Sequence, residues 1–63
     1  MTVQEIMHFI NYDRSSEIFS FCYELDELID DNNIEEVINR IQKRFNCDQE
    51  TANNVFVEYK KQI

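Results

Sequence analysis

The chain has 63 residues and a net charge of −7, from 13 acidic and 6 basic side chains. All of this net charge lies in residues 1–33, because the acids and bases of residues 34–63 balance each other. Such a field repels phosphate backbones, so we expect no direct nucleic-acid binding and a protein partner with a basic surface. Gly and Pro are absent, which removes the usual residues of tight hairpins and favours an all-α fold.

Nothing in the sequence divides the chain or directs it to a membrane. The N-terminal residues lack the basic segment of a signal peptide, and no apolar run reaches the roughly 18 residues of a membrane span. We therefore expect residues 1–63 to form a single cytoplasmic helical domain that binds no membrane. Cys22 and Cys47 are expected to be reduced, each at a position that suits a small apolar side chain.

The first predicted helix covers residues 3–11. Thr2 and Glu5 have the spacing of a capping box, in which each side chain accepts a hydrogen bond from the other residue's backbone N–H. A helix this short requires tertiary packing to persist. Its apolar residues recur at helical spacing and share one face, which comprises Val3, Ile6, Met7 and Ile10.

The second predicted helix covers residues 16–31, with Asp13 or Ser15 as its N-cap. The alternating stretch at residues 17–25 would also suit a strand, but apolar residues continue at helical spacing beyond it. The apolar face comprises Ile18, Phe21, Cys22, Leu25, Leu28 and Ile29, widened on one side by Phe19 and Tyr23. This widening predicts a central helix that touches two neighbours.

The third predicted helix covers residues 34–45, and the fourth covers residues 49–62. Asn33, with a glutamate three positions later, has the spacing of a second capping box, and Asp48 is the expected N-cap of the last helix. Asn46 is expected to end the third helix in the left-handed conformation, where glycine is missing.

These segments predict a compact three-helix bundle plus a short N-terminal helix. Loops of about two to four residues suit helices that pack in succession. The expected core consists of the inward-facing apolar side chains, namely Ile6, Ile10, Ile18, Phe21, Cys22, Leu25, Leu28, Ile34, Val37, Ile38, Ile41, Phe45, Ala52, Val55, Phe56 and Tyr59.

Residues 22–33, CYELDELIDDNN, carry a dense run of carboxylates on the second predicted helix. These side chains fall between the apolar positions, and like charges one turn apart cost only a few tenths of a kcal/mol each, which a solvated face tolerates. A face that serves solubility alone would also include lysine, whereas residues 15–33 contain no base. A docking surface for a basic partner is therefore a second interpretation. The five acids are Glu24, Asp26, Glu27, Asp30 and Asp31.

The residues offer little for metal binding or catalysis. The acidic run lacks the alternating spacing and the glycine of a calcium loop. His8, Cys22 and Cys47 are single and far apart in the sequence, unlike the paired ligands of a zinc site. The absence of Gly also removes the loops that cradle phosphates. We therefore expect no metal, no cofactor and no enzymatic activity.

Residues 24–29, ELDELI, resemble part of the S-Q-E-L-D-x-L-I signature of the small Spo0E-like aspartyl-phosphate phosphatases. Cys22 and Tyr23 stand where that signature has Ser and Gln. This resemblance implies a different function, the dephosphorylation of a phospho-aspartyl partner.

Residues 25–63 are similar in pattern to the C-terminal helical part of PqqD-like domains, the precursor-peptide recognition elements of peptide-modifying pathways. The resemblance implies peptide binding. PqqD-like domains begin with three β-strands, for which residues 1–15 are too short, so we transfer no binding residue. The matching positions are Ile34, Glu35, Glu36, Val37, Ile38, Phe45, Asp48, Glu50, Ala52, Val55, Phe56 and Tyr59.

The sequence favours a small acidic, non-catalytic protein-binding module, an adaptor or inhibitor, that docks a basic surface through its second helix. The alternative is a regulator of nucleic-acid machinery whose acidic face imitates phosphates, which would need two rows of carboxylates instead of one strip. An aromatic side chain outside the core would also support a homodimer. The expected partner contacts are Glu24, Glu27, Asp30, Asp31 and Tyr23, with Phe9 and Phe19 as further aromatic anchors.

Overall fold

The computed structural model describes all 63 residues, which form four helices and no strand. The all-α prediction is therefore confirmed, and every predicted helix agrees with the structure to within two residues at its ends. No helix has the length and the apolar character that crossing a membrane requires. The helices are α1 (Val3–Tyr12), α2 (Ser16–Asp30), α3 (Ile34–Phe45) and α4 (Gln49–Lys60).

In three of the four helices the predicted N-cap residue forms a side-chain cap. Thr2 and Glu5 form the complete capping box of α1, with hydrogen bonds of 2.9 and 3.1 Å. Ser15, and not Asp13, caps α2, while the Asp13 carboxylate accepts the backbone N–H of Ser15. Asp48 caps α4. The side-chain oxygens satisfy backbone N–H groups that have no partner inside the helix.

Asn33 is the N-cap residue of α3 as predicted, but its predicted capping box does not form, because the preceding turn fixes its backbone. Asn32 is left-handed, with a φ of 59°. The backbone N–H groups of Asn32 and Asn33 donate to the carbonyls of Ile29 and Leu28, at 2.9 and 2.8 Å, which is the Schellman pattern of a helix C-terminus. Asn33 therefore has a ψ of 67° and makes no side-chain cap. Asn46, by contrast, adopts the predicted left-handed conformation.

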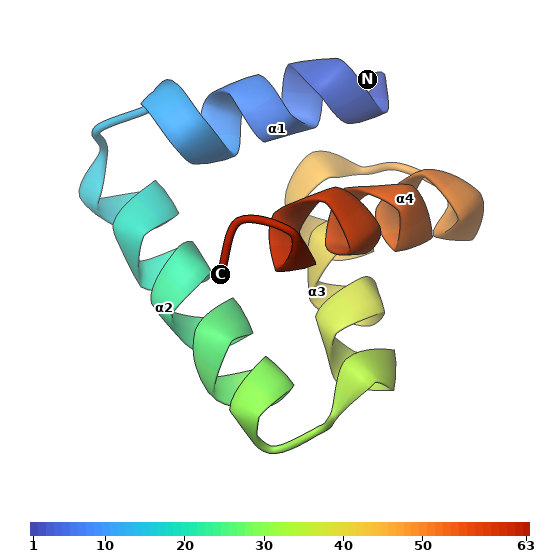
Figure 1. The fold of residues 1–63 in the computed structure, drawn as a ribbon. Coiled ribbons are helices and arrows are strands. Elements are labelled where there is room, and N and C mark those ends of the chain that lie inside the picture. The colour runs from blue at the N-terminus through green and yellow to red at the C-terminus, as the bar shows by residue number, and fades with distance from the viewer.

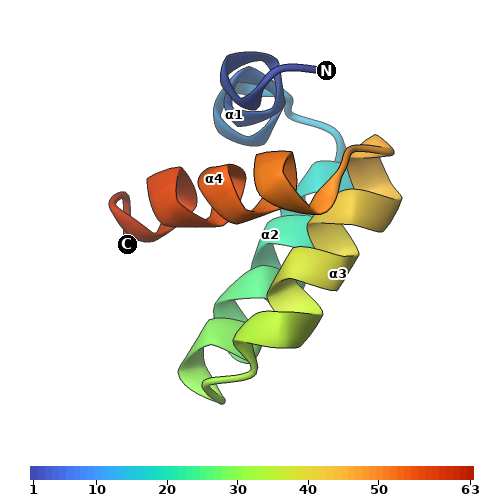
Figure 2. The ribbon, with the colours of Figure 1, turned by 90° about the vertical axis from the view of Figure 1, so that its right-hand side faces the viewer.

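Helix α4 occupies the middle of the molecule. It lies between α1 and the pair formed by α2 and α3, which run side by side and are joined by a short turn (Figures 1 and 2). The second helix touches two neighbours, α1 and α3, as predicted. The central position belongs to α4 instead, and the two aromatic residues that widened the apolar face of α2 are exposed. Phe19 and Tyr23 are 57% and 66% exposed.

Thirteen apolar side chains form one core, and each helix contributes at least three of them. Twelve were predicted, and Met7 is the addition. Figure 2 shows that α4 crosses the α2–α3 pair away from the connecting turn. Four residues predicted for the core are instead only partly buried and pack against it: Cys22, Leu28, Ile34 and Ile38.

Candidate functional site

The carboxylates of residues 24–31 fall into two groups, those that bind side chains of other helices and those that do not. Glu24 belongs to the first group, because it accepts a hydrogen bond from Arg40 of α3. The same guanidinium donates to Glu36 across 3.1 Å. Arg40 thus joins α2 to α3 at the surface and compensates the charge of Glu24. Such exposed pairs contribute at most about 1 kcal/mol to stability.

Asp26 also binds within the protein. Its carboxylate accepts a hydrogen bond of 2.6 Å from the hydroxyl of Tyr59 in α4, and this hydroxyl lies 3.4 Å from the backbone carbonyl of Cys22. Tyr59 is buried. Its burial and its hydrogen bond to Asp26 both raise the pKa of the phenol. Asp26 therefore fixes α2 against the end of α4.

The second group is Glu27, Asp30 and Asp31, which are exposed and form no ion pair. We call these three residues the acidic end of α2, since they lie in its last turn and at its C-cap. That turn contains no basic residue. The carbonyl groups at a helix C-terminus already carry about half a negative charge, so acids are unfavourable there. The acidic end is therefore a concentration of charge that the fold itself leaves uncompensated.

Phe19 and Tyr23 extend this surface along α2. Phe19, Tyr23 and Glu27 follow one another at intervals of one helical turn, so their side chains share one face of α2. The hydrogen bond and the charge of Glu27 raise the pKa of the Tyr23 hydroxyl. The face thus combines two exposed aromatic rings with adjacent negative charge.

Phe9, the other predicted anchor, lies on α1 in a different environment. Its ring centroid is 6.4 Å from that of Phe45 in α3, and the side chain is 44% exposed. It lines a recess of about 250 Å³ together with His8, Tyr12 and Asp13. The His8 and Tyr12 ring centroids lie 4.8 Å apart, with the ring planes tilted by 39°. The structure therefore does not bring Phe9 together with the acidic end of α2.

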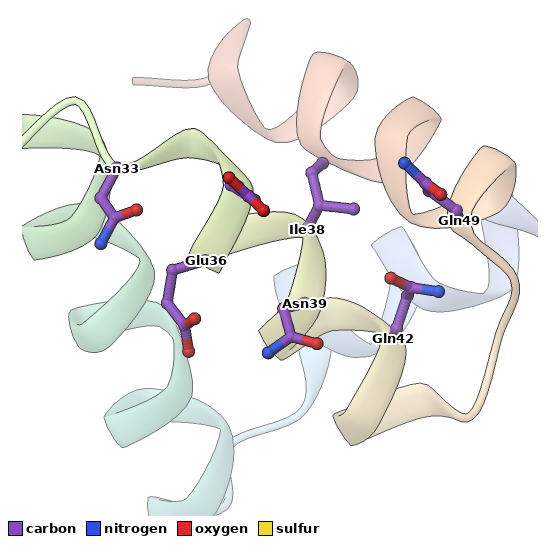
Figure 3. Close-up of a pocket in the computed structure, with 7 residues that line it drawn as sticks. Asn33, Glu36, Ile38, Asn39, Gln42 and Gln49 are labelled. Atoms are coloured by element: carbon purple, nitrogen blue, oxygen red, sulfur yellow. The ribbon is translucent and has the colours of Figure 1, made fainter.

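A larger depression, of about 620 Å³, lies along α3 (Figure 3). It begins at the turn after the acidic end of α2 and reaches the first residue of α4. Its lining is polar except for one isoleucine. We call it the α3 groove, and its lining residues are Asn33, Glu35, Glu36, Ile38, Asn39, Gln42 and Gln49.

No group of three or more His, Cys, Asp or Glu side chains is placed to hold a metal ion. Cys22 and Cys47 are free and partly buried. Burial raises the pKa of both thiols. A raised pKa reduces the fraction of thiolate, which is the reactive form, so neither cysteine has the environment of an activated nucleophile.

Comparisons with protein-family models, curated proteins and solved structures find no match for this chain. The PqqD-like and Spo0E-like resemblances therefore stay predictions. In the structure, residues 24–29 lie within α2, and residues 25–63 comprise the end of α2 followed by α3 and α4.

Sequence reasoning missed Arg40 and Tyr59 as partners of the acidic run. The spacing of Glu36 and Arg40, four residues apart on one helix, was a visible signal for half of the arginine pairing. The bonds to Glu24 and Asp26 join residues 16 and 33 positions apart. No local pattern in the sequence indicates contacts over such separations.

Proposed function

We propose that this protein is a small, non-catalytic protein-binding module, an adaptor or inhibitor, that docks a basic partner surface through the acidic end of α2. One observation carries the proposal: Glu27, Asp30 and Asp31 have no ion pair and lie at a helix end that disfavours negative charge. A partner's lysine or arginine side chains remove this repulsion on binding. Relief of this repulsion contributes to the free energy of binding.

The exposed rings of Phe19 and Tyr23 supply the apolar part of the surface. Aromatic side chains are enriched at interfaces because they offer a large contact area and lose little conformational entropy. We therefore expect a partner with an apolar groove flanked by basic residues. Its association is accelerated by electrostatic steering and slows as salt is added.

The proposal includes an arrangement of the helices. We take α2, α3 and α4 as a three-helix bundle to which the short α1 is added. In this arrangement Arg40 of α3 and Tyr59 of α4 each form a hydrogen bond to α2 and fix its position. The binding surface is then presented on a fixed element, which loses little entropy when it docks.

Imitation of a nucleic-acid backbone has weaker support. It needs two rows of carboxylates along α2. Helical spacing would build them from Glu24, Glu27 and Asp31 and from Asp26 and Asp30, but Glu24 and Asp26 bind Arg40 and Tyr59 instead. The acids without such partners gather at one end of the helix. This distribution favours docking of a protein surface.

The test compares two sets of substitutions that change the net charge equally. E27Q/D30N/D31N neutralises the acidic end, and E17Q/E50Q/E58Q neutralises three exposed acids elsewhere. Partners crosslinked to the wild-type protein in its own cells are identified and purified, and their affinities for both variants are measured. We expect the first set to weaken binding by about tenfold or more and the control by less than about threefold.

Unchanged binding by E27Q/D30N/D31N, with its helical circular dichroism intact, contradicts the proposal. Equal losses in both sets also contradict it, because only total charge then matters. A dimer in sedimentation that F19S/Y23S dissociates would assign the aromatic face to self-association. Release of phosphate from a phospho-aspartyl protein would establish the phosphatase alternative.

A further inference from the structure

Four side-chain carboxamides line the α3 groove, and none of them makes a hydrogen bond within the protein. Figure 3 shows Asn39 and Gln42 along α3, with Asn33 at one end and Gln49 of α4 at the other. The chain has seven Asn and four Gln, so more than a third of its carboxamides gather in this one depression.

The free carboxamide of Asn33 results from the turn that precedes α3. A residue at this position ordinarily uses its side chain to cap the helix. The Schellman turn holds the backbone of Asn33 in a conformation in which the side chain makes no cap hydrogen bond. Its oxygen and its amino group are consequently available to a ligand.

The chemistry of this lining selects a peptide. A carboxamide has an acceptor oxygen and two N–H donors, so it can pair with both the N–H and the C=O of a peptide unit. A helical ligand has already satisfied these groups internally, so the groove favours an extended chain. No aromatic ring lines it, which disfavours stacked bases, and its two carboxylates disfavour phosphates.

We propose that the α3 groove binds an extended, basic segment of the partner's chain, whose backbone pairs with the carboxamides. Glu36 is held by Arg40, whereas Glu35 has no ion pair and receives a lysine or arginine of the segment. The groove begins two residues after Asp31, so the segment continues from the acidic end of α2. This inference rests on the proposed function and extends it from a basic surface to an extended basic peptide.

The test titrates the ¹⁵N-labelled protein with a capped heptapeptide of alternating lysine and serine. A matched peptide carries methyl groups on its backbone nitrogens, which keeps the charge but removes the N–H donors. The side-chain NH₂ signals of asparagine and glutamine report the groove directly. We expect the four groove signals to shift and those of Asn53 and Asn54, which are exposed on α4, to stay. The methylated peptide should bind about tenfold more weakly.

Two double substitutions complete the design. N39A/Q42A should weaken binding of the unmethylated peptide by about tenfold, whereas N53A/N54A should leave it unchanged. Both replace helical residues with the best helix former, so the fold should tolerate them. Equal affinities for the two peptides, or equal effects of the two variants, overturn the inference.

The remaining outcomes separate this inference from the proposed function. If the heptapeptide shifts only signals of residues 27–31, the groove assignment fails and the proposed function stands. If the peptide shifts no signal at all, the inference fails, and the proposed function is decided by the charge-matched variants and the purified partner.

Discussion

Helices α2 and α3 are neighbours with opposite arrangements of charge. α3 has two acids in its first turn and two bases in its last turn, so the helix dipole favours the charges at both ends. α2 also has an acid in its first turn, but its last turn contains acids and no base. The charges of α3 stabilise the fold, whereas those at the end of α2 oppose it. This difference is the basis of our proposal that the end of α2 serves binding.

The ion pairs between α2 and α3 show which acids of α2 have their charge compensated. Arg40 is the one base that forms an ion pair with residues 24–31, and it reaches Glu24. One turn further along α2, Glu27 has no such partner. The uncompensated part of α2 therefore begins one turn beyond the contact with Arg40 and continues into the turn that leads to the α3 groove.

The largest expected effect tests whether α2 is held by the same core as α3. Leu25 is fully buried, so L25A should cost about 2–5 kcal/mol of unfolding free energy. A chain of this length has roughly 3–9 kcal/mol in total, so L25A should be largely unfolded. F19A, on the exposed face of the same helix, should change stability by less than about 0.5 kcal/mol. Urea unfolding measures both, and similar effects would mean that the two faces of α2 are wrongly assigned.

The next effect concerns the bond between α4 and α2. Y59F removes the hydrogen bond to Asp26 and should cost about 1 kcal/mol at neutral pH. The pKa of Tyr59 is raised in the folded state above its ordinary value of 10.0. The wild type should therefore keep this stabilisation below about pH 10 and lose it as the pH rises further.

Y59F should accordingly show a shallower alkaline loss of stability than the wild type in thermal unfolding followed from neutral to alkaline pH. Y12F, which changes an exposed tyrosine of α1, is the control. An alkaline loss that is identical in Y59F and the wild type would rule out Tyr59 as its source.

A smaller effect tests the charge comparison itself. D30N/D31N should stabilise the fold by roughly 0.5–1 kcal/mol, because it removes acids from a helix C-terminus. E35Q/E36Q should destabilise it by a similar amount, because it removes acids from a helix N-terminus and breaks the pair with Arg40. Chemical unfolding at low salt measures both changes. If the two variants shift stability in the same direction, the contrast between α2 and α3 is wrong.

The smallest effect concerns the N-cap of α4. Hydrogen bonds from Thr51 hold the pKa of Asp48 below its ordinary value of 3.8. The cap therefore contributes stability above about pH 3.8 that is lost as the pH falls through the folded-state pKa. D48N keeps a capping oxygen without a titrating group, so its melting temperature should fall less steeply in acid. E58Q, at an exposed position, is the control. If D48N does not change how steeply the melting temperature falls with pH, the loss of stability in acid comes from other carboxylates.

Local features of the fold could be read from the sequence, and contacts between helices could not. Thr2 and Asp48 cap their helices as predicted because capping depends on residues three positions apart. Asn33 forms no capping box because the end of the previous helix sets its backbone. The site divides in the same way: the exposed acids at the end of α2 follow from helical spacing, whereas the engagement of Glu24 and Asp26 depends on how α3 and α4 pack.

The most direct test of the account is the salt dependence of partner affinity for the two charge-matched variants. Binding through the acidic end of α2 predicts that E27Q/D30N/D31N flattens the dependence of affinity on ionic strength, whereas E17Q/E50Q/E58Q keeps the wild-type slope. Equal slopes for the two variants would contradict the account, since the partner would then respond to the net charge of the protein and not to one end of one helix.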